Sequence, residues 1–342
     1  MTGKINVAIL GATGNVGRKF LEILEERNFL IGDLKLLASN NSVGKKIIFS
    51  GKECTVELAT QDSFKGVDLV LASAGAKVSK ELIPYAVKAK AVVIDNSSAY
   101  RMEKEVPLVI CGVNDEDLKK HEGIIANPNC TTAQLVVPLK VLGDLAGLKR
   151  VIVSTYQSVS GAGKAAMDEL TEQTKAYLSS GKYSFSRINK KFAFNVVPHI
   201  DVFCDDGYTK EEVKVINESR KILGLPDLRI TCTAVRVPVY IGHSESVNVE
   251  LEQHVTRDQI IEALNATPLI KVIDDPKNEK YPMAIDLAET DPVYVGRIRE
   301  DNSCPNAFNF WVVADNLRIG AALNAVRIAE YIVKELLLLT HK

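Results

Sequence analysis

The sequence predicts an α/β protein with two domains, and three observations support this prediction. A chain of 342 residues is long enough for one or two domains with cores of their own. The first third alternates short apolar runs with helical periodicity, which is typical of a parallel sheet covered by helices. From Val151 the order changes, and a long helix-forming run closes the sequence. We expect a doubly wound domain over 1–129 and 316–342, and an α+β domain over 130–315.

Composition argues against several classes of partner. The net charge of −1 gives no reason to expect binding to nucleic acid or to an anionic membrane. No apolar run reaches the length of a membrane span, and the first residues lack the layout of a signal peptide. None of the six cysteines forms a C-x-x-C pair, so no metal site or dithiol motif is predicted. We therefore expect a reducing, cytoplasmic setting.

The chain begins with a strand, a glycine-rich turn and a helix. Ile5 to Leu10 is apolar and β-branched, residues 11–17 read GATGNVG, and helical spacing follows. This is the first unit of a Rossmann domain, in which Gly11 permits the turn, Gly14 lets the backbone approach a pyrophosphate and Gly17 lets the helix pack closely. Glycine-rich turns also occur in ordinary βα units, so the motif alone leaves both interpretations open.

The second strand, Leu34 to Ala38, is followed by residues that favour NADP over NAD. An NAD site usually has an acid here for the ribose 2′-hydroxyl, but residues 39–42 read Ser-Asn-Asn-Ser. The cations Lys45 and Lys46 follow. A 2′-phosphate would meet donors and positive charge rather than repulsion. The alternative is a polar loop with two solvated lysines.

Three more strands are predicted, at Val67 to Ala72, Ala91 to Ile94 and Leu108 to Cys111, with a helix over Val78 to Ala89. In such sheets ligands bind beyond the carboxyl ends of the strands. Arg101 follows a turn at such an end, so it could reach an anion there. The alternative is a surface arginine.

Cys130 lies where an apolar stretch ends and an apolar helix begins. A thiol at a helix N-terminus faces unpaired backbone N–H groups and the positive end of the helix dipole, which both favour a thiolate. The same N–H groups can hold an oxyanion made when the thiolate attacks a carbonyl. The alternative is a cysteine that only packs.

The second domain opens with a strand, Val151 to Tyr156, and a second glycine-rich turn at 157–163 that starts a helix near Lys164. Gly161 and Gly163 would let the backbone come close to a ligand, such as the nicotinamide end of a cofactor. An ordinary turn is the alternative.

Thr209 and Glu212 match a capping box, which predicts a helix with Val213, Ile216 and Leu223 on one face. Glu211 and Lys214 share another face. They form either a solvated ion pair or a pair of ligands, the lysine for an anion and the acid for an ammonium.

His243 follows an apolar run, 236–241, that predicts a strand, and a second strand at 246–251 leads away from it. Sheet on both sides would hold this imidazole in place, although a lone histidine is often structural. His199 is the other histidine that could serve as an acid or base.

The last predicted helix, Asp315 to Leu339, carries small residues that permit close packing, and we expect it to return to the first domain.

Together these segments resemble one family, the NADP-dependent aspartate-β-semialdehyde dehydrogenases. The resemblance covers nearly the whole chain. It rests on GATGNVG at 11–17, DNSSAYRM at 95–102, NPNCTT at 127–132, QSVSGAG at 157–163, RVPVYIGHSES at 236–246 and RIGAALNAVRIAE at 318–330.

The resemblance implies an activity and a set of roles. The activity is the reversible, NADPH-dependent reductive dephosphorylation of L-4-aspartyl phosphate to L-aspartate 4-semialdehyde through a Cys thioester, in the biosynthesis of lysine (through diaminopimelate), threonine and methionine. The resemblance makes 1–129 with 316–342 the NADP-binding domain, 130–315 the catalytic and dimerisation domain, and the protein a homodimer. Implied roles are catalysis for Cys130, His243 and Asn129; substrate binding for Gln157, Arg236 and Glu211; phosphate binding for Arg101 and Lys214; and NADP binding for Gly11, Thr13, Gly14, Asn15, Val16, Asn41, Ser42, Ser160, Gly161 and Asn316.

Two alternatives remain at this point. N-acetyl-γ-glutamyl-phosphate reductase shares the domain plan and the Cys/His chemistry, but its substrate lacks the free ammonium that Glu211 would bind. A non-catalytic, NADP-sensing Rossmann protein would need neither a nucleophile nor a base.

Asn41 departs from the family pattern at the predicted NADP site, because many relatives have Arg in this stretch.

Overall fold

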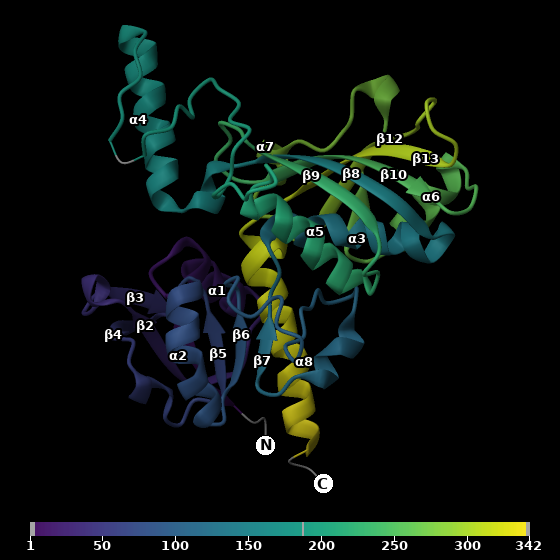
Figure 1. Cartoon of the computed structure of the whole chain (residues 1–342). Helices are drawn as coiled ribbons and strands as arrows, with labels where there is room; N and C mark the ends of the chain where they lie inside the picture. The colour runs from purple at the N-terminus through teal and green to yellow at the C-terminus, as the bar shows by residue number, and fades with distance from the viewer. Residues whose placement is uncertain (1–3, 187, 340–342) are drawn as a thin grey trace. The chain divides into compact units, whose positions relative to one another are not determined.

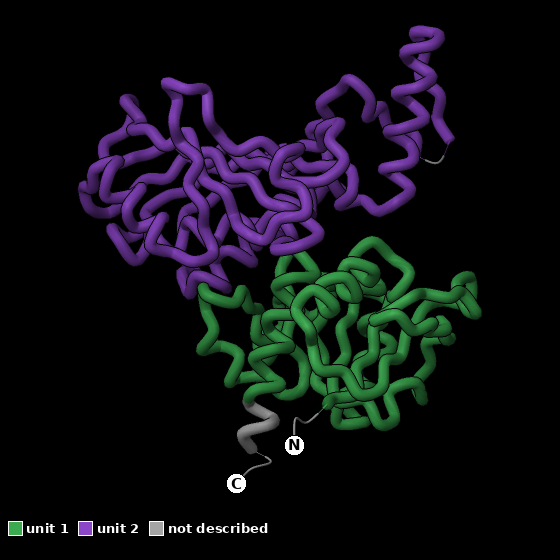
Figure 2. Tube along the Cα trace, turned by 180° about the vertical axis from the view of Figure 1, so that it is seen from behind, with its two compact units in different colours: residues 1–129, 321–342 green, residues 130–320 purple. Residues whose placement is uncertain are grey.

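The computed structural model describes residues 4–186 and 188–339, with side chains to residue 334 in the last helix. It divides into two compact units, Met1–Asn129 with Ala321–Lys342 and Cys130–Gly320 (Figure 2). The predicted boundary at 315/316 lies five residues earlier than the one at 320/321. The reason is local: Asn316 hydrogen-bonds Ser160, and Arg318 pairs with Asp291, so this stretch belongs to unit 2. Residues 1–3 and 340–342 of the predicted ranges lie outside the described chain.

Unit 1 is a Rossmann-type domain, which confirms the predicted fold class. Its sheet has the order β3-β4-β2-β1-β5-β6-β7, and every neighbouring pair is parallel except the β3/β4 hairpin. The order reverses at β1, whose residues Val7–Leu10 are buried on both faces, as expected of a doubly wound sheet. The strands are β1 (Ile5–Leu10), β2 (Ile31–Ala38), β3 (Lys46–Phe49), β4 (Lys52–Leu58), β5 (Leu69–Ala72), β6 (Val92–Asp95) and β7 (Ile124–Ala126).

The helices of unit 1 include α1, α2 and the returning α8 (Figure 1). α8 contacts α1 and β6, so the predicted return of the last helix is confirmed. Arg27 and Glu330 join α1 to α8 through two hydrogen bonds of 2.7 and 2.8 Å. The helices and helical turns are α1 (Asn15–Glu26), η1 (Asn40–Ser42), η2 (Gln61–Phe64), α2 (Ala76–Lys88), η3 (Asp115–Lys120) and α8 (Leu323–Leu339).

Two sequence predictions in this unit were wrong. Residues 108–111 do not form a strand, because the Asn114 side chain takes the Ile110 N–H and donates to the Leu108 carbonyl, which removes both from a ladder. Only an isolated bridge joins Leu108 to Ala126 in the short strand β7. The last helix also begins at Leu323 instead of 315, after a π-helical turn, η6 (Arg318–Ala322).

Unit 2 is built on a six-stranded sheet of order β11-β12-β13-β10-β8-β9. Helices α3, α5 and α6 contact this sheet, and α3 contacts both other helices. Along β8 every second residue is buried, as expected where helices cover one face. The elements are α3 (Cys130–Ala146), β8 (Leu148–Gln157), η4 (Val159–Ala162), α4 (Lys164–Ser180), α5 (Lys210–Leu223), β9 (Arg229–Arg236), β10 (His243–Leu251), α6 (Arg257–Asn265), β11 (Ile270–Val272), η5 (Pro276–Asn278), α7 (Ala284–Leu287), β12 (Val293–Glu300) and β13 (Ala307–Ala314).

Two elements of unit 2 differ from the sequence predictions. β9 ends at Arg236, so the predicted strand over 236–241 is a loop. The capping box of Thr209 and Glu212 is confirmed, but α5 buries Glu211, Val215 and Ile222 instead of the predicted apolar face. The buried face of α5 is therefore partly charged, and this difference positions the site described below.

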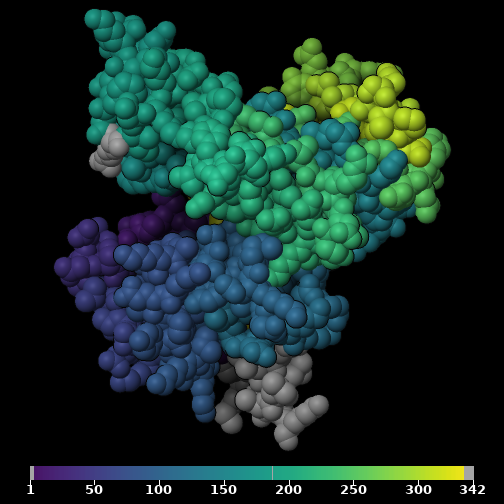
Figure 3. All heavy atoms as spheres, in the orientation of Figure 1, coloured from purple at the N-terminus to yellow at the C-terminus, as the bar shows by residue number. Residues whose placement is uncertain are grey.

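The helix α4 extends away from the sheet of its own unit (Figure 1). A small core of Val159, Leu170 and Phe192 connects it to the chain that follows. This segment forms the teal projection in Figure 3. Its exposed apolar side chains include Leu178 and Phe194. Within residues 4–186 and 188–339, none of the helices is long and apolar enough to cross a membrane.

Candidate active site

The sulfur of Cys130 lies 3.2 Å from Nε2 of His243. Cys130 is the first residue of α3 and His243 the first residue of β10, so two element ends bring them together. A third segment, at Gly320, packs closely against Cys130. If Gly320 carried a side chain, its Cβ would lie only 2.9 Å from the Cys130 Cβ. A thiol at a helix N-terminus beside an imidazole is the arrangement expected of an activated nucleophile.

The tautomer of His243 follows from its other nitrogen. Nδ1 accepts a hydrogen bond of 3.1 Å from the Ser158 backbone N–H, which can only donate. In the neutral imidazole the proton is therefore on Nε2, where it faces the sulfur of Cys130. His243 is fully buried, and burial together with the Arg236 guanidinium lowers the pKa of its imidazole to about 3. The ring is thus neutral at ordinary pH and presents an N–H donor to a thiolate.

Strand ends also explain how the polar residues around this pair converge. β8 and β9 are parallel, and their last residues, Gln157 and Arg236, are partners in the ladder. β10 runs antiparallel to β8 and begins at His243. Gln157, Arg236 and His243 therefore lie at the same end of three neighbouring strands. Arg236 donates to the Ser158 carbonyl at 2.6 Å, and Nε2 of His243 lies 3.3 Å from a Cβ built at Gly161.

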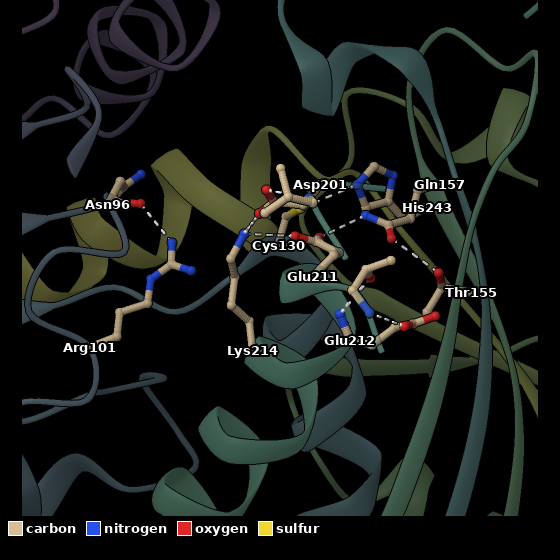
Figure 4. A network of polar contacts seen from close by, with 12 residues as sticks. Asn96, Arg101, Cys130, Thr155, Gln157, Asp201, Glu211, Glu212, Lys214 and His243 are labelled. Atoms are coloured by element: carbon tan, nitrogen blue, oxygen red, sulfur yellow. Dashed lines mark hydrogen bonds and ion pairs between the residues drawn. The ribbon is translucent and has the colours of Figure 1, made fainter. Parts of the chain in front are cut away.

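A chain of polar contacts continues from β8 onto α5 (Figure 4). Gln157 donates to Oε1 of Glu211 at 3.1 Å, and Lys214 lies 3.0 Å from Oε2 of the same carboxylate. Asp201 contacts the other side of the Lys214 ammonium at 2.7 Å, and the Thr155 hydroxyl donates to Oε1 of the Gln157 side chain at 3.1 Å. Burial lowers the pKa of Lys214, but Glu211 and Asp201 outweigh it and leave that pKa above its ordinary value.

Ser160 and Asn316 complete the surroundings of His243. Asn316 is buried, donates to Ser160 at 3.0 Å and accepts from the Gly242 N–H at 2.9 Å. Ser158 also donates to Asn316. This network holds the loop that precedes His243. The rival histidine, His199, instead contacts Lys190 and stacks on Phe203.

Most of the remaining predicted residues belong to unit 1. At Gly11 and Gly17 a side chain would clash with the backbone. A Cβ at Gly11 would lie 2.4 Å from the Ser73 carbonyl oxygen, and one at Gly17 would lie 2.2 Å from the Gly11 oxygen. A Cβ at Gly14 would meet nothing closer than 3.4 Å, so its backbone is open to a ligand. Asn15 and Val16 begin α1, whose N-terminus suits a pyrophosphate. These residues therefore fit a dinucleotide.

The loop beyond β2 meets this turn. Thr13 and Ser42 lie 3.1 Å apart through their hydroxyl oxygens, while Asn41 is exposed. Arg101 is 7% exposed and donates to the carbonyl oxygens of Asn127 and Asn96, so it is not a free surface side chain. Asn129 is also buried, directly before Cys130.

Sequence reasoning missed Thr155, Ser158 and Asp201. Their roles depend on contacts with residues that are distant in the chain, and no local pattern indicates them.

In the part of the chain that the structure describes, no group of His, Cys, Asp or Glu side chains could hold a metal ion. All six cysteines are free thiols. Burial raises the pKa of the Cys111 thiol to about 12, so this thiol is a poor nucleophile at ordinary pH.

Known proteins resemble the chain over almost its full length. Residues 6–121 match the family model described as "Semialdehyde dehydrogenase, NAD binding domain", and residues 139–319 match "Semialdehyde dehydrogenase, dimerisation domain". The aspartate-semialdehyde dehydrogenase of Aquifex aeolicus is 52% identical over 96% of this chain and 98% of its own length.

Solved structures agree with this match. Aspartate semialdehyde dehydrogenase II of Vibrio cholerae complexed with ASA is 43% identical, has a TM-score of 0.94, and covers 97% of this chain and 99% of its own. The Candida albicans enzyme with NADP is 26% identical at a TM-score of 0.76, over 96% and 98% of the two chains. The chain therefore belongs to the aspartate-semialdehyde dehydrogenase family.

Proposed function

We propose that the protein catalyses the reversible, NADPH-dependent reductive dephosphorylation of L-4-aspartyl phosphate to L-aspartate 4-semialdehyde, a step in lysine (through diaminopimelate), threonine and methionine biosynthesis. The observation that carries the proposal is the contact of 3.2 Å between Cys130 and His243, with the Nε2 proton directed at the sulfur. A sensor of NADP would not need this pair. The relatives reported above are aspartate-semialdehyde dehydrogenases, which favours this substrate over the acetylated one.

The first half of the reaction belongs to Cys130. Its thiolate attacks the acyl carbon of the substrate, the bond from that carbon to the phosphate oxygen breaks, and phosphate leaves a thioester on the sulfur. The N–H groups that begin α3, with Asn129, hold the oxyanion formed during the attack. A thioester is required because a carboxylate resists hydride attack.

The second half uses His243. NADPH, when bound, supplies a hydride to the thioester carbon. The Nε2–H of His243 donates a hydrogen bond to the oxyanion of the resulting tetrahedral intermediate, and this oxygen re-forms the carbonyl as the carbon–sulfur bond breaks. Aldehyde leaves and the thiolate of Cys130 is restored. The Ser158 N–H keeps Nδ1 in the acceptor state throughout, so the proton remains on the nitrogen that faces the reaction.

Substrate recognition uses the charges around this pair. We assign the substrate α-carboxylate to Arg236 and its ammonium to Glu211, with Gln157 between them. We assign the phosphate to Lys214 and Arg101. In the structure Lys214 pairs with Asp201, and Arg101 donates to the Asn96 carbonyl.

The cofactor is NADP, and the fit of unit 1 to a dinucleotide supports this assignment. Gly11, Gly14 and the start of α1 at Asn15 and Val16 would hold the pyrophosphate, and Thr13, Asn41 and Ser42 the adenosine ribose. From unit 2, Ser160, Gly161 and Asn316 would contact the nicotinamide end.

We also propose a homodimer in the cytoplasm. One support is the match of residues 139–319 to a dimerisation domain. Another is an apolar cavity of about 930 Å³ in unit 2, whose lining includes Tyr156, Tyr281 and Trp311, beside the exposed Ile285. Free cysteines and NADPH chemistry suit a reducing compartment. Light scattering on the purified protein measures its mass, and a monomer would contradict the dimer.

One assay tests the proposed activity. Reduction of NADP by aspartate semialdehyde should require phosphate and should be lost in Cys130→Ala. The matched control is Cys304→Ala, because this half-buried thiol donates to the Pro305 carbonyl in the connection between β12 and β13. Activity with the acetylated acyl phosphate alone would instead identify the related reductase. Full activity of Cys130→Ala would contradict a thioester mechanism.

A further inference from the structure

We propose that Lys45 supplies the positive charge that binds the 2′-phosphate of NADP and so determines the preference for NADP over NAD. This inference rests on the proposed use of NADP. The site is the carboxyl end of β2, where dinucleotide folds contact the ribose of the adenosine. The sequence offers two adjacent cations there, Lys45 and Lys46, and the structure distinguishes them.

Ser42 links this position to the glycine-rich turn. Its side chain is buried, and its hydroxyl lies 3.1 Å from the Thr13 hydroxyl and 3.4 Å from the Lys45 ammonium. The Thr13 hydroxyl belongs to the turn that would hold the pyrophosphate. Lys45 is therefore connected, through one serine, to the part of unit 1 where the adenosine ribose would lie.

The backbone of this loop is fixed on both sides of Lys45. The Val56 N–H donates to the Lys45 carbonyl at 2.9 Å, and the Gly44 N–H donates to the Val56 carbonyl at 2.9 Å. The Lys45 N–H donates to the Ser42 carbonyl at 3.3 Å. The ammonium thus extends from an anchored backbone, which reduces the conformational entropy lost when it binds an anion.

Lys46 has a different environment. Its ammonium lies 2.9 Å from Glu53 and donates to the Thr55 hydroxyl at 2.9 Å, within the β3/β4 hairpin. Its charge is already paired with a carboxylate. Among the described residues, Lys45 has no carboxylate partner, and the sequence from residue 39 to residue 52 contains no acid. Of the two adjacent lysines, Lys45 is the one whose ammonium has no carboxylate partner within the described residues.

These observations specify the ligand chemistry. A phosphate monoester at the ribose 2′ position carries close to two negative charges, and it would meet the Lys45 ammonium and the Ser42 hydroxyl. The 2′-hydroxyl of NAD would gain little from a cation there. Because a hydrogen bond between charged groups is stronger than a neutral one, losing Lys45 should affect the phosphorylated cofactor selectively.

The test compares binding and turnover in Lys45→Ala, Lys45→Arg and the matched control Lys46→Ala. Calorimetry with 2′,5′-ADP and with 5′-AMP measures binding without turnover. We expect Lys45→Ala to weaken 2′,5′-ADP binding by about tenfold or more and to leave 5′-AMP unchanged. Lys45→Arg should retain most of the affinity, and Lys46→Ala should match the unaltered protein. The ratio of kcat/KM for NADPH to that for NADH should fall in parallel.

The outcomes separate this inference from the proposed function. An unaltered protein that prefers 2′,5′-ADP, together with a Lys45→Ala variant that still prefers it equally, would overturn the role of Lys45 alone. Equal losses for both nucleotides would also overturn it, because they indicate a structural effect. An unaltered protein that binds the two nucleotides equally would contradict both the NADP assignment and this inference. Lys45 is exposed, so its replacement leaves the core of unit 1 intact.

Discussion

The proposed cofactor end of unit 1 and the thiol site of unit 2 are built in different ways. In unit 1 a single stretch, 11–17, provides a turn, open backbone and a helix N-terminus. In unit 2 the groups are side chains from α3, β8, α5, β9 and β10, held by a buried hydrogen-bonded network. The first construction depends on the space that glycines leave, and the second on the position of particular atoms. Substitutions should therefore change cofactor affinity in unit 1 and the chemical step in unit 2.

The largest effect should come from Cys130→Ser. The hydroxyl is a far weaker nucleophile, so kcat should fall by about 10⁴-fold or more with little change in Tm. Steady-state kinetics and differential scanning fluorimetry measure the two quantities. A fall in kcat of less than tenfold would contradict the claim that the chemical step depends on this side chain of unit 2.

His243→Asn should follow, with kcat lower by about 10²- to 10⁴-fold. The asparagine oxygen can still accept the Ser158 N–H, but the group at the position of Nε2 is missing. The rate of Cys130 alkylation at neutral pH should fall as well, because the thiolate loses its donor. Unchanged alkylation by iodoacetamide would show that the imidazole does not stabilise the sulfur.

Glu211→Ala should raise the KM for aspartate semialdehyde by about 10- to 100-fold, since a charge-assisted contact to the substrate ammonium would be lost. Glu212→Gln is the neighbouring control, because Glu212 caps α5 and binds the Thr209 and Ala234 N–H groups instead. Equal effects of the two variants on KM would mean that the helix, and not the Glu211 carboxylate, is responsible.

Gly14→Ala tests whether the open backbone of unit 1 determines cofactor affinity. The added methyl would meet only the Gly11 oxygen at 3.4 Å, so the fold should tolerate it, while the KM for NADPH should rise by about tenfold. Gly17→Ala should behave in the opposite way, because its Cβ would lie 2.2 Å from backbone oxygen and would destabilise unit 1 by about 1–3 kcal/mol. Calorimetry and cofactor titration separate the two effects.

The local features of both units could be predicted from sequence. The strand, turn and helix at 5–26 are contiguous, and hydrophobic period and glycine spacing indicate them directly. The capping box at Thr209 is confirmed for the same reason. The start of a helix at Cys130 also follows from its neighbours in the chain.

Long-range contacts could not be predicted in this way. The proton on Nε2 of His243 is determined by Ser158, which lies 85 residues away in the chain, and a second partner of Lys214, besides Glu211, is Asp201 in an irregular loop. The failed strand at 108–111 has the same origin, because Asn114 satisfies its backbone groups. A pattern of apolar residues does not report which hydrogen bonds are already taken.

The smallest effect concerns stability at acid pH. The pKa of His243 falls from about 6.5 in an unfolded chain to about 3 in the fold. Between these values the unfolded state binds the extra proton, so stability should decrease as pH falls from 6.5 towards 3. His243→Asn removes this contribution, at up to about 1.4 kcal/mol per pH unit. The Tm of the unaltered protein should therefore fall more steeply below pH 6.5 than that of the variant, and parallel curves would contradict the assignment.

The most direct test of the central claim is to trap the acyl group on its sulfur. The protein is mixed with aspartate semialdehyde and NADP without phosphate, and NADPH formation and peptide masses are measured together. We predict one equivalent of NADPH per site, an aspartyl group on the peptide that contains Cys130, and its release when phosphate is added. Stoichiometric NADPH with no adduct at Cys130, or an adduct on another residue, would contradict the account.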